Sequence, residues 1–369
     1  MPGAVYSPFA DRLVGHPGPI FPLHVGDTWM EPFAGARMQE ITVEDHPGMH
    51  RYCDARGLPE LVDALVEKLR EKNSLRVERE SVLVTGGATG GLSCVVGSLI
   101  EPGEEVLILA PFWPLIRGIV QSFRGVPVEV PFYDRIDSPE AALEAVRARC
   151  TERTAALYVS TPSNPTGRVI PESLLAALAD FAREKQLWLL SDEVYEDFVY
   201  RGRHVSIGSM APERTLSVFS FSKAYGMAGN RVGYVAGPAE VITEARKIGI
   251  HSFYQAPTAG QLAGLRALRG ASAWVAEARE SYRDAGERAA RELGQPEPEG
   301  STFLFLDVRH RLDERGIYGF LEDCFKDGVL VAPGSSSGAE YAGWVRVCYT
   351  AAPPAHVREA IIRLARRVR

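Results

Sequence analysis

Residues 155–194 read AALYVSTPSNPTGRVIPESLLAALADFAREKQLWLLSDEV and contain a strand–helix–strand pattern. Apolar runs of strand length stand at its two ends, Ala155–Thr161 and Trp188–Val194. Between them, Glu172–Lys185 has apolar residues at the three- and four-residue spacing of a helix with one buried face. Because strands that alternate with helices form parallel sheets covered on both faces, this segment predicts an α/β fold.

The same alternation extends along the chain in both directions. Further buried strands are expected at Val82–Gly86, Glu105–Ala110, Pro127–Phe132, Thr215–Phe221 and Val232–Gly237. Helices are expected between strands, among others at Thr89–Ile100 and Ser138–Cys150. Together these elements predict a mostly parallel seven-stranded sheet flanked by helices.

The pattern changes after about residue 257. A helical segment, a Pro-rich linker, two short strands and a closing helix follow in turn, at Ala259–Leu293, 295–300, Thr302–Val308, Val345–Tyr349 and from His356 onward. We therefore expect a large domain over residues 45–257. A smaller α+β domain would be built from both chain ends, residues 1–44 and 258–369, with Ala259–Leu293 as the interdomain helix region.

The composition is that of a soluble globular protein. The chain has 369 residues, room for roughly two domains, and 41 basic against 47 acidic side chains give a net charge of −6. This balance argues against nucleic-acid and anionic-membrane partners, and no apolar run approaches the roughly 20 residues that span a bilayer. Five scattered cysteines and the lack of a signal-peptide pattern predict a cytoplasmic protein.

One histidine pair has the spacing of a metal site. His46 and His50 stand four residues apart, as two ligands on one helix would. Pro47 and Gly48 between them disfavour a helix, so we expect loop histidines and no metal.

Several predicted strands are followed directly by residues with chemically reactive or ligand-binding side chains. Parallel sheets bind ligands at these carboxyl ends of their strands. After residues 82–86, the run GGATGG opens a helix, and its small residues and Thr89 suit either a phosphate cup or a tight turn. Trp113 follows the next strand and would either stack on a flat ring or join the core.

Three further strand ends carry an amide, an acid and a lysine. Prolines fix the loop around Asn164, and Asp192 lies in an apolar run where its buried carboxylate would need a charged partner. Lys223 follows a buried strand, with Arg231 eight residues later. A phosphate cup, an aromatic plate, a buried acid and a strand-end lysine together indicate pyridoxal 5′-phosphate, which needs a lysine for its Schiff base and an acid at its pyridine nitrogen.

With these motifs the chain resembles the class I/II aminotransferases of the fold-type I pyridoxal-phosphate superfamily, which are similar to aspartate aminotransferase. The most specific motifs are Asn164-Pro165-Thr166-Gly167, Asp192-Glu193-Val194-Tyr195, Ser220-Phe221-Ser222-Lys223 and Arg231-Val232-Gly233. The resemblance implies that Lys223 forms the Schiff base and moves the substrate proton, and that Asp192 pairs with the pyridinium nitrogen. Asn164 and Tyr195 would hydrogen-bond the phenolic oxygen of the cofactor.

The resemblance also implies the rest of the site. Further cofactor-binding residues would be Gly87, Ala88, Thr89, Trp113, Ser220, Ser222, Arg231 and Tyr52. Tyr52 resembles a tyrosine that reaches the phosphate of the partner subunit, which implies a homodimer with shared sites. Substrate-binding residues would be Gly26, Asn164, Arg346 and Trp29, with Arg346 clamping the α-carboxylate. The loop 251–257, where a partner chain usually touches substrate, offers no clear second arginine.

The resemblance implies transfer of an amino group between an L-amino acid and a 2-oxo acid by a ping-pong mechanism. An alternative is a same-fold enzyme of another reaction type, a C–S β-lyase, an amino-acid cyclase or a synthase, including one of secondary metabolism. Hydrolase interpretations are weaker: Ser220-x-x-Lys223 lacks an accompanying KTG, and His356 is the one histidine after the GxSxG pattern at 334–338. A binding-only relative would be expected to lack Lys223 or Asp192, and both are present.

Overall fold

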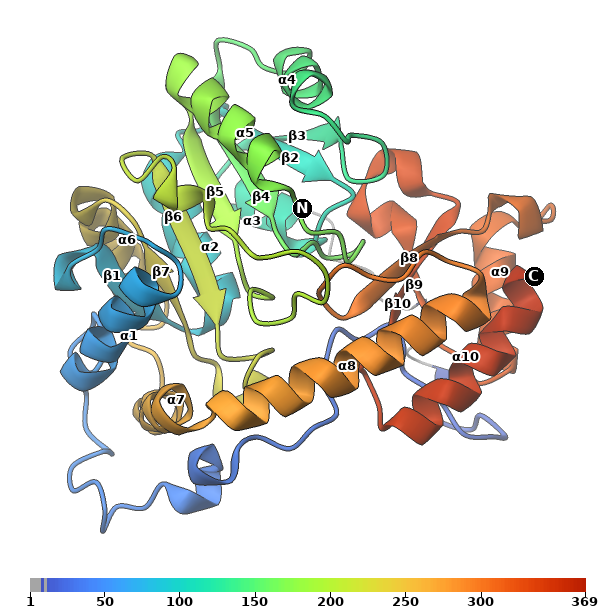
Figure 1. Ribbon diagram of the computed structural model, residues 1–369, viewed down its shortest axis with the longest axis horizontal. Helices are drawn as coiled ribbons and strands as arrows, with labels where there is room; N and C mark the ends of the chain where they lie inside the picture. Colours follow the sequence, from blue (N-terminus) through green and yellow to red (C-terminus); the bar gives the residue numbers. More distant parts are fainter. Residues whose placement is uncertain (1–7, 10–11) are drawn as a thin grey trace.

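The computed structural model describes residues 8–9 and 12–369 (Figure 1). Its larger sheet has the strand order β1-β7-β6-β5-β4-β2-β3. The strands are β1 (Val82–Thr85), β2 (Glu105–Ala110), β3 (Val126–Pro131), β4 (Thr154–Ser160), β5 (Trp188–Asp192), β6 (Thr215–Ser220) and β7 (Gly233–Ala236). β7 pairs antiparallel with both neighbours, whereas all other neighbouring strands are parallel. The predicted mostly parallel seven-stranded sheet is confirmed, with strand ends shifted by one or two residues.

Helices cover both faces of this sheet. One face packs against α2 (Gly87–Leu99), α3 (Leu115–Ser122) and α6 (Ala239–Ser252). The other packs against α1 (Pro59–Glu71), α4 (Pro139–Arg147), α5 (Glu172–Glu184) and α7 (Thr258–Gly270). Successive residues of β4 alternate between the two cores, with Tyr158 toward α2 and Leu157 and Val159 toward α5. Burial on both faces explains why the strands are continuous apolar runs.

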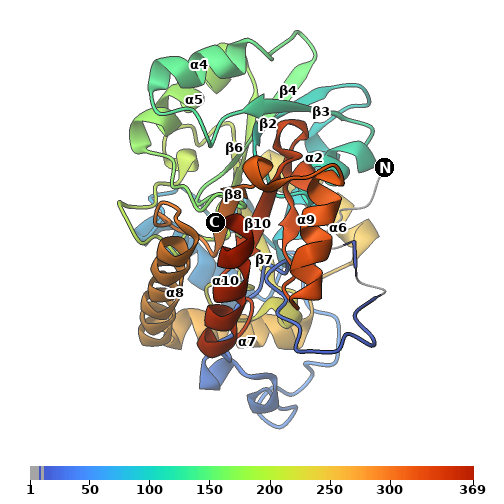
Figure 2. The same cartoon turned by 90° about the vertical axis from the view of Figure 1, so that its right-hand side faces the viewer.

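A second, smaller sheet stands beside the first. Its antiparallel strands, in the order β8-β10-β9, are β8 (Phe303–Asp307), β9 (Ala332–Pro333) and β10 (Trp344–Cys348). The helices α9 (Gly316–Lys326) and α10 (Pro354–Val368) belong to this region. In Figure 1 the long helix α8 (Ser272–Leu293), drawn in orange, runs from α7 beneath the large sheet to the small one. Figure 2 shows the side view, in which α8 again lies beside α10.

Segments from both ends of the chain share the core of the smaller region. Phe9, Phe21 and Leu23 pack in one apolar cluster with residues of β8, β10 and α10, and Phe21 forms a parallel bridge with Val329. This packing supports a small domain built from both chain ends. The domain bounds, residues 45–257 against 1–44 and 258–369, stay a prediction. Residues 1–7 and 10–11 of the predicted small domain lie outside the described residues.

The single helical segment expected at Ala259–Leu293 is two helices. α7 ends at Gly270, and Ala271, with φ −94° and ψ 11°, leaves helical geometry before α8 begins at Ser272. Glycine is a poor helix former, so Gly270 is a favourable place for the first helix to end. Across the part of the chain that the structure describes, no helix has both the length and the apolar character that crossing a bilayer requires.

Candidate active site

A pocket of about 380 Å³ opens beyond the carboxyl ends of the parallel strands, between the two sheets. It is lined by His24, Val25, Gly26, Ala88, Thr89, Leu92, Trp113, Asn164, Asp192, Val194, Tyr195, Ser220, Ser222, Lys223, Ala228, Arg231 and Arg346. The pocket thus brings together every predicted site residue except Gly87, Tyr52 and Trp29. The topology explains this gathering, because the loops after β1, β2, β4, β5 and β6 leave the same edge of the sheet.

One end of the pocket is suited to a phosphate group. The N-terminus of α2 points its free N–H groups here, and β7 can approach it because a Cβ on Gly233 would stand 2.7 Å from Ala88 N and Gly87 C. Arg231, at a left-handed φ of 55°, lies against this turn, since a Cβ on Gly87 would stand 2.5 Å from its Nη2. Gly87, although outside the lining, therefore makes room for the guanidinium. Nearby hydroxyl groups come from Thr89, Ser220 and Ser222.

Lys223 reaches the middle of the pocket from the end of β6. Its Nζ donates a hydrogen bond to the carbonyl oxygen of Gly26. Burial lowers the pKa of the Lys223 amine from its ordinary value. A lowered pKa increases the fraction of neutral amine, which is the form that reacts with a carbonyl carbon.

Asp192 ends β5 and is 4% exposed. Its Oδ2 accepts a hydrogen bond from the Tyr158 hydroxyl at 2.6 Å, and its Oδ1 a long one from Val194 N at 3.4 Å. Burial raises the pKa of the carboxyl to about 6, opposed by the Tyr158 hydrogen bond. Within residues 8–9 and 12–369, Asp192 forms no ion pair with a lysine, arginine or histidine. The charged partner expected from the sequence is therefore not found among the described residues, and the buried carboxylate suits a protonated ring nitrogen.

Arg346 comes to the pocket from β10 of the small sheet and is 3% exposed. Its Nη1 donates to Asn164 Oδ1 at 3.0 Å and its Nη2 to the His24 carbonyl at 2.8 Å. The guanidinium lies 4.6 Å from the centre of the Phe303 ring. Because Asn164 accepts with its oxygen, its NH₂ group is the part left to donate to another acceptor.

Tyr195 closes the same side of the pocket. It is buried, and burial raises the pKa of its phenol well above the ordinary value. Its ring meets Phe303 edge-to-face at 5.8 Å between ring centres. Tyr195 is therefore a neutral hydrogen-bonding group beside Arg346 in this chain.

Tyr52 and Trp29 lie outside the pocket wall. Tyr52 is 81% exposed, and its ring packs on Tyr254 at 4.8 Å. Trp29 packs edge-to-face on Tyr282 at 4.5 Å. In the single chain, neither side chain reaches the ligand space.

His24 lines the pocket although its position in the sequence carried no signal for a site. Its Nδ1 is buried without a hydrogen-bond partner, and burial together with the nearby Arg346 charge lowers the pKa of the imidazole to about 4. His24 is thus neutral at neutral pH. A lone histidine outside any regular element could be assigned to the pocket only from its neighbours in space.

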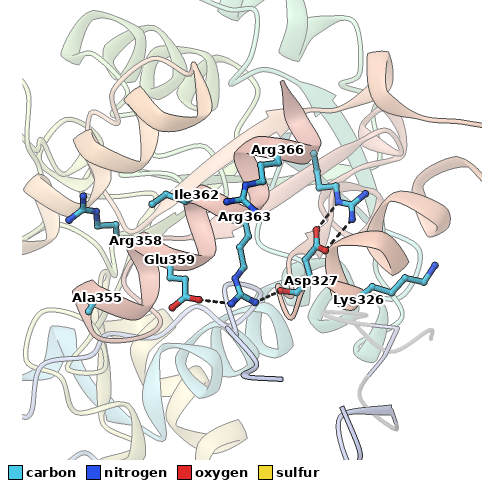
Figure 3. Close-up of a pocket in the computed structure, with 9 residues that line it drawn as sticks. Lys326, Asp327, Ala355, Arg358, Glu359, Ile362, Arg363 and Arg366 are labelled. Carbon is cyan, nitrogen blue, oxygen red and sulfur yellow. Dashed lines mark hydrogen bonds and ion pairs between the residues drawn. The ribbon is translucent and has the colours of Figure 1, made fainter. Parts of the chain in front are cut away.

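A larger hollow of about 820 Å³ is lined by residues of α10 and of the C-terminal end of α9; Figure 3 shows these residues. Its walls are mostly charged groups, among them Lys326, Arg358 and Arg366. Arg367 pairs with Asp327, and Arg363 pairs with Glu359 (Figure 3). None of the predicted site residues lies here, so its size alone does not make it the active site.

Comparisons with known proteins identify the family to which a pocket of this kind belongs. The family model described as aminotransferase class I and II matches residues 20–364. A probable aspartate/prephenate aminotransferase of Thermus aquaticus is 37% identical over 330 residues, 86% of this chain and 84% of its own length. Aromatic-amino-acid aminotransferase 2 of Thermococcus litoralis is 33% identical over 319 residues, 83% of this chain and 81% of its own.

Solved structures give the same result. The aspartate aminotransferase of Thermus thermophilus with maleate superposes with a TM-score of 0.85 at 34% identity, covering 93% of this chain and 90% of its own. These relatives do not favour the alternative lyase, cyclase or synthase activity. The chain belongs to the class I and II aminotransferases and transfers amino groups with pyridoxal 5′-phosphate as its cofactor.

Proposed function

We propose that amino-group transfer takes place in the pocket between the two sheets, with Lys223 and Asp192 as its central catalytic residues. The observation that carries this assignment is a pair of ionisable groups lining one cavity: a partly buried amine with a lowered pKa, and a buried carboxylate without a cationic partner among the described residues. Burying both groups is unfavourable unless a ligand uses them.

The other pocket residues fit the parts of the cofactor. Asp192 would hold the proton on the pyridine nitrogen, and Asn164 and Tyr195 would contact the phenolic oxygen. Trp113 would stack on the ring. The phosphate would lie at the N-terminus of α2, contacted by Gly87, Ala88, Thr89, Ser220, Ser222 and Arg231. When bound, pyridoxal phosphate withdraws electrons from the Cα of the amino acid.

Lys223 moves the proton in this proposal. With the donor amine bound, Lys223 would be a free, neutral amine at Nζ. It would take the proton from the substrate Cα and return it on the cofactor side of the substrate nitrogen. The same residue works in reverse when the 2-oxo acid accepts the amino group.

Arg346 would clamp the α-carboxylate of the substrate with its planar fork, with the Gly26 backbone on the opposite side. Lys223, Arg231 and Arg346 each have a role in this scheme, and the described lining contains no further cation. We therefore propose that donors with uncharged side chains are preferred over dicarboxylates. Apolar lining from Val25, Leu92 and Val194 supports this preference.

We also propose that the enzyme is a cytoplasmic homodimer. Tyr52 is exposed beside Tyr254 and would reach the phosphate in the partner subunit. The five cysteines are all free thiols in the described structure, which suits a reducing compartment.

An amino-donor panel tests the proposal. Each donor is mixed with the holoenzyme, and the visible band of the bound cofactor is followed through the first half-reaction. We expect conversion to the pyridoxamine form with neutral donors, and no conversion in Lys223→Ala, which should keep its fold. Release of pyruvate and ammonia, or turnover by Lys223→Ala, would overturn the assignment.

A further inference from the structure

The Tyr158 hydroxyl is the group that holds the Asp192 carboxylate. Tyr158 lies on β4, two positions before Ser160, which pairs with Asp192 on β5. Residues two apart on a strand face the same side, so Tyr158 and Asp192 are diagonal neighbours on the face covered by α2. The phenol bridges this diagonal and donates to Asp192 Oδ2 at 2.6 Å.

Packing fixes the Tyr158 ring. The side chain is fully buried and belongs to the apolar cluster that includes Leu92, Ile108 and Leu190. Tyr158 does not line the pocket, so its hydroxyl acts on Asp192 from behind, away from the ligand space. Burial raises the pKa of the phenol far above its ordinary value, so the hydroxyl is a permanent donor.

The two carboxylate oxygens have different environments. Oδ2 receives the short bond from Tyr158, whereas Oδ1 has only the long contact with Val194 N. The negative charge of Glu193 opposes ionisation of Asp192. In addition to burial, the Asp192 charge in turn raises the pKa of the phenols of Tyr133 and Tyr195. Tyr158 is thus the one side chain in the described structure that donates a hydrogen bond to this carboxylate.

We propose that Tyr158 is a positioning residue for Asp192, which keeps the carboxylate ionised and directs it to the ring nitrogen of the cofactor. A hydrogen bond to the ionised form lowers the proton affinity of the carboxylate, so the shared proton stays on the pyridine nitrogen. A positively charged ring withdraws electrons more strongly and makes the Schiff base less basic. This inference rests on the proposed role of Asp192.

Tyr158→Phe removes the hydroxyl and keeps the ring in the core. We expect kcat to fall about tenfold while the KM of the amino donor changes less than about threefold, because Tyr158 touches no substrate. The pH midpoint of the visible band should rise by about one pH unit, and the affinity of the cofactor-free protein for pyridoxal phosphate should fall about tenfold.

Tyr133→Phe is the matched control. Tyr133 is also a buried tyrosine near the strand ends, but its hydroxyl bonds the backbone of Ser160, donating to O at 2.7 Å and accepting from N at 2.9 Å. We expect this variant to lose stability and to keep the wild-type kcat and visible midpoint. A merely structural role for Tyr158 would make the two variants behave alike.

A double-mutant cycle separates the inference from the proposed function. In the Asp192→Asn background, Tyr158→Phe should produce no further change in the visible midpoint. An unchanged midpoint in Tyr158→Phe alone, or an equal shift in both backgrounds, would overturn the role of Tyr158. The proposed function would instead be overturned if the wild-type protein showed no visible cofactor band, or if borohydride reduction did not attach the cofactor to Lys223.

Discussion

Burial acts on Lys223 and Asp192 in opposite directions. It lowers the pKa of the amine and raises that of the carboxyl to about 6, so both charged forms are disfavoured in the cofactor-free pocket. A protonated pyridine ring would give Asp192 the counter-charge that no described residue supplies. Binding of the cofactor would then relieve the unfavourable burial of these groups, and this relief would contribute to cofactor affinity.

The first prediction concerns stability and pH. The pKa of Asp192 in the folded protein, about 6, is above the ordinary 3.8, so the folded state favours the protonated carboxyl. The stability that depends on this protonation is fully present below pH 3.8 and is lost as pH rises through 6. At pH 8 the buried carboxylate costs about 3 kcal/mol, from a difference of roughly 2.2 pH units. Cofactor-free Asp192→Asn should therefore be more stable than wild type at pH 8, and the gain should vanish near pH 4.

Urea unfolding of both cofactor-free proteins at the two pH values measures this difference. The control is the holoenzyme, in which the wild type should gain more stability from cofactor than Asp192→Asn does. An equal free energy of unfolding at pH 8 would mean that the Asp192 carboxylate is compensated within the chain.

The second prediction concerns the substrate clamp. Arg346→Lys keeps a positive charge but removes the planar fork and weakens the contact with Phe303. We expect the KM of amino donors to rise roughly tenfold to a hundredfold, as for loss of a charge-assisted hydrogen bond. Steady-state kinetics with an unaltered KM would remove Arg346 from the substrate site.

Candidate catalytic residues are easier to predict from the sequence than the residues that position them. Lys223, Asp192 and Asn164 can be predicted because each stands at a strand end, where residue order alone fixes the location. Tyr158 looks like one more apolar strand residue, since its contact with Asp192 depends on the pairing of β4 with β5. His24 enters the pocket only through the approach of the small sheet.

At the scale of elements, the contact between β7 and the N-terminus of α2 shapes the phosphate end of the pocket. β7 is the antiparallel strand between β1 and β6, and it lies directly against the turn that opens α2. A side chain on β7 at this point would displace the helix N–H groups that are proposed to bind the phosphate.

Gly233→Ala tests this contact. Its Cβ would stand 2.7 Å from three backbone atoms, Ala88 N, Gly87 C and Phe219 O, so the helix end must move. We expect a loss of about 2 kcal/mol in the free energy of unfolding and weaker binding of pyridoxal phosphate. Gly229→Ala, with no atom within 4 Å of the new Cβ, is the matched control and should show neither effect. Wild-type cofactor affinity in Gly233→Ala would contradict the packing argument.

Elements with a clear period were predictable and short ones were not. The helix at Glu172–Lys185 was expected from its apolar stripe and is observed at Glu172–Glu184. β9 has only two residues, Ala332–Pro333, too few for a period to show. The break between α7 and α8 lies inside one continuous helical pattern, and only Gly270 hints at it.

At the scale of the whole molecule, the pocket depends on both sheets. The large sheet supplies Lys223 and Asp192, and the small sheet supplies Arg346 from β10. The bond from Arg346 to Asn164 joins the two regions across the cavity, whereas its bond to the His24 carbonyl stays within the small region. A change in the relative position of the two regions would therefore move the proposed substrate clamp relative to the proposed cofactor site.

The proposed homodimer would place Tyr52 of one chain at the phosphate end of the partner's pocket. We expect sedimentation of the holoenzyme to show a dimer, and Tyr52→Ala to bind pyridoxal phosphate about tenfold more weakly, as for loss of one charge-assisted hydrogen bond. Tyr318→Ala is the control, since Tyr318 is also exposed, at 52%, and lies on α9 away from the pocket.

Mixed dimers decide whether the site is shared. When one chain carries Lys223→Ala and the other Tyr52→Ala, the site with the intact Lys223 receives the intact Tyr52 only if Tyr52 crosses the interface. The mixed dimer, isolated through two affinity tags, should then contain one site with wild-type cofactor affinity and turnover. If Tyr52 served its own chain, that site would be as weak as in the Tyr52→Ala homodimer. A monomer in sedimentation would contradict the shared site directly.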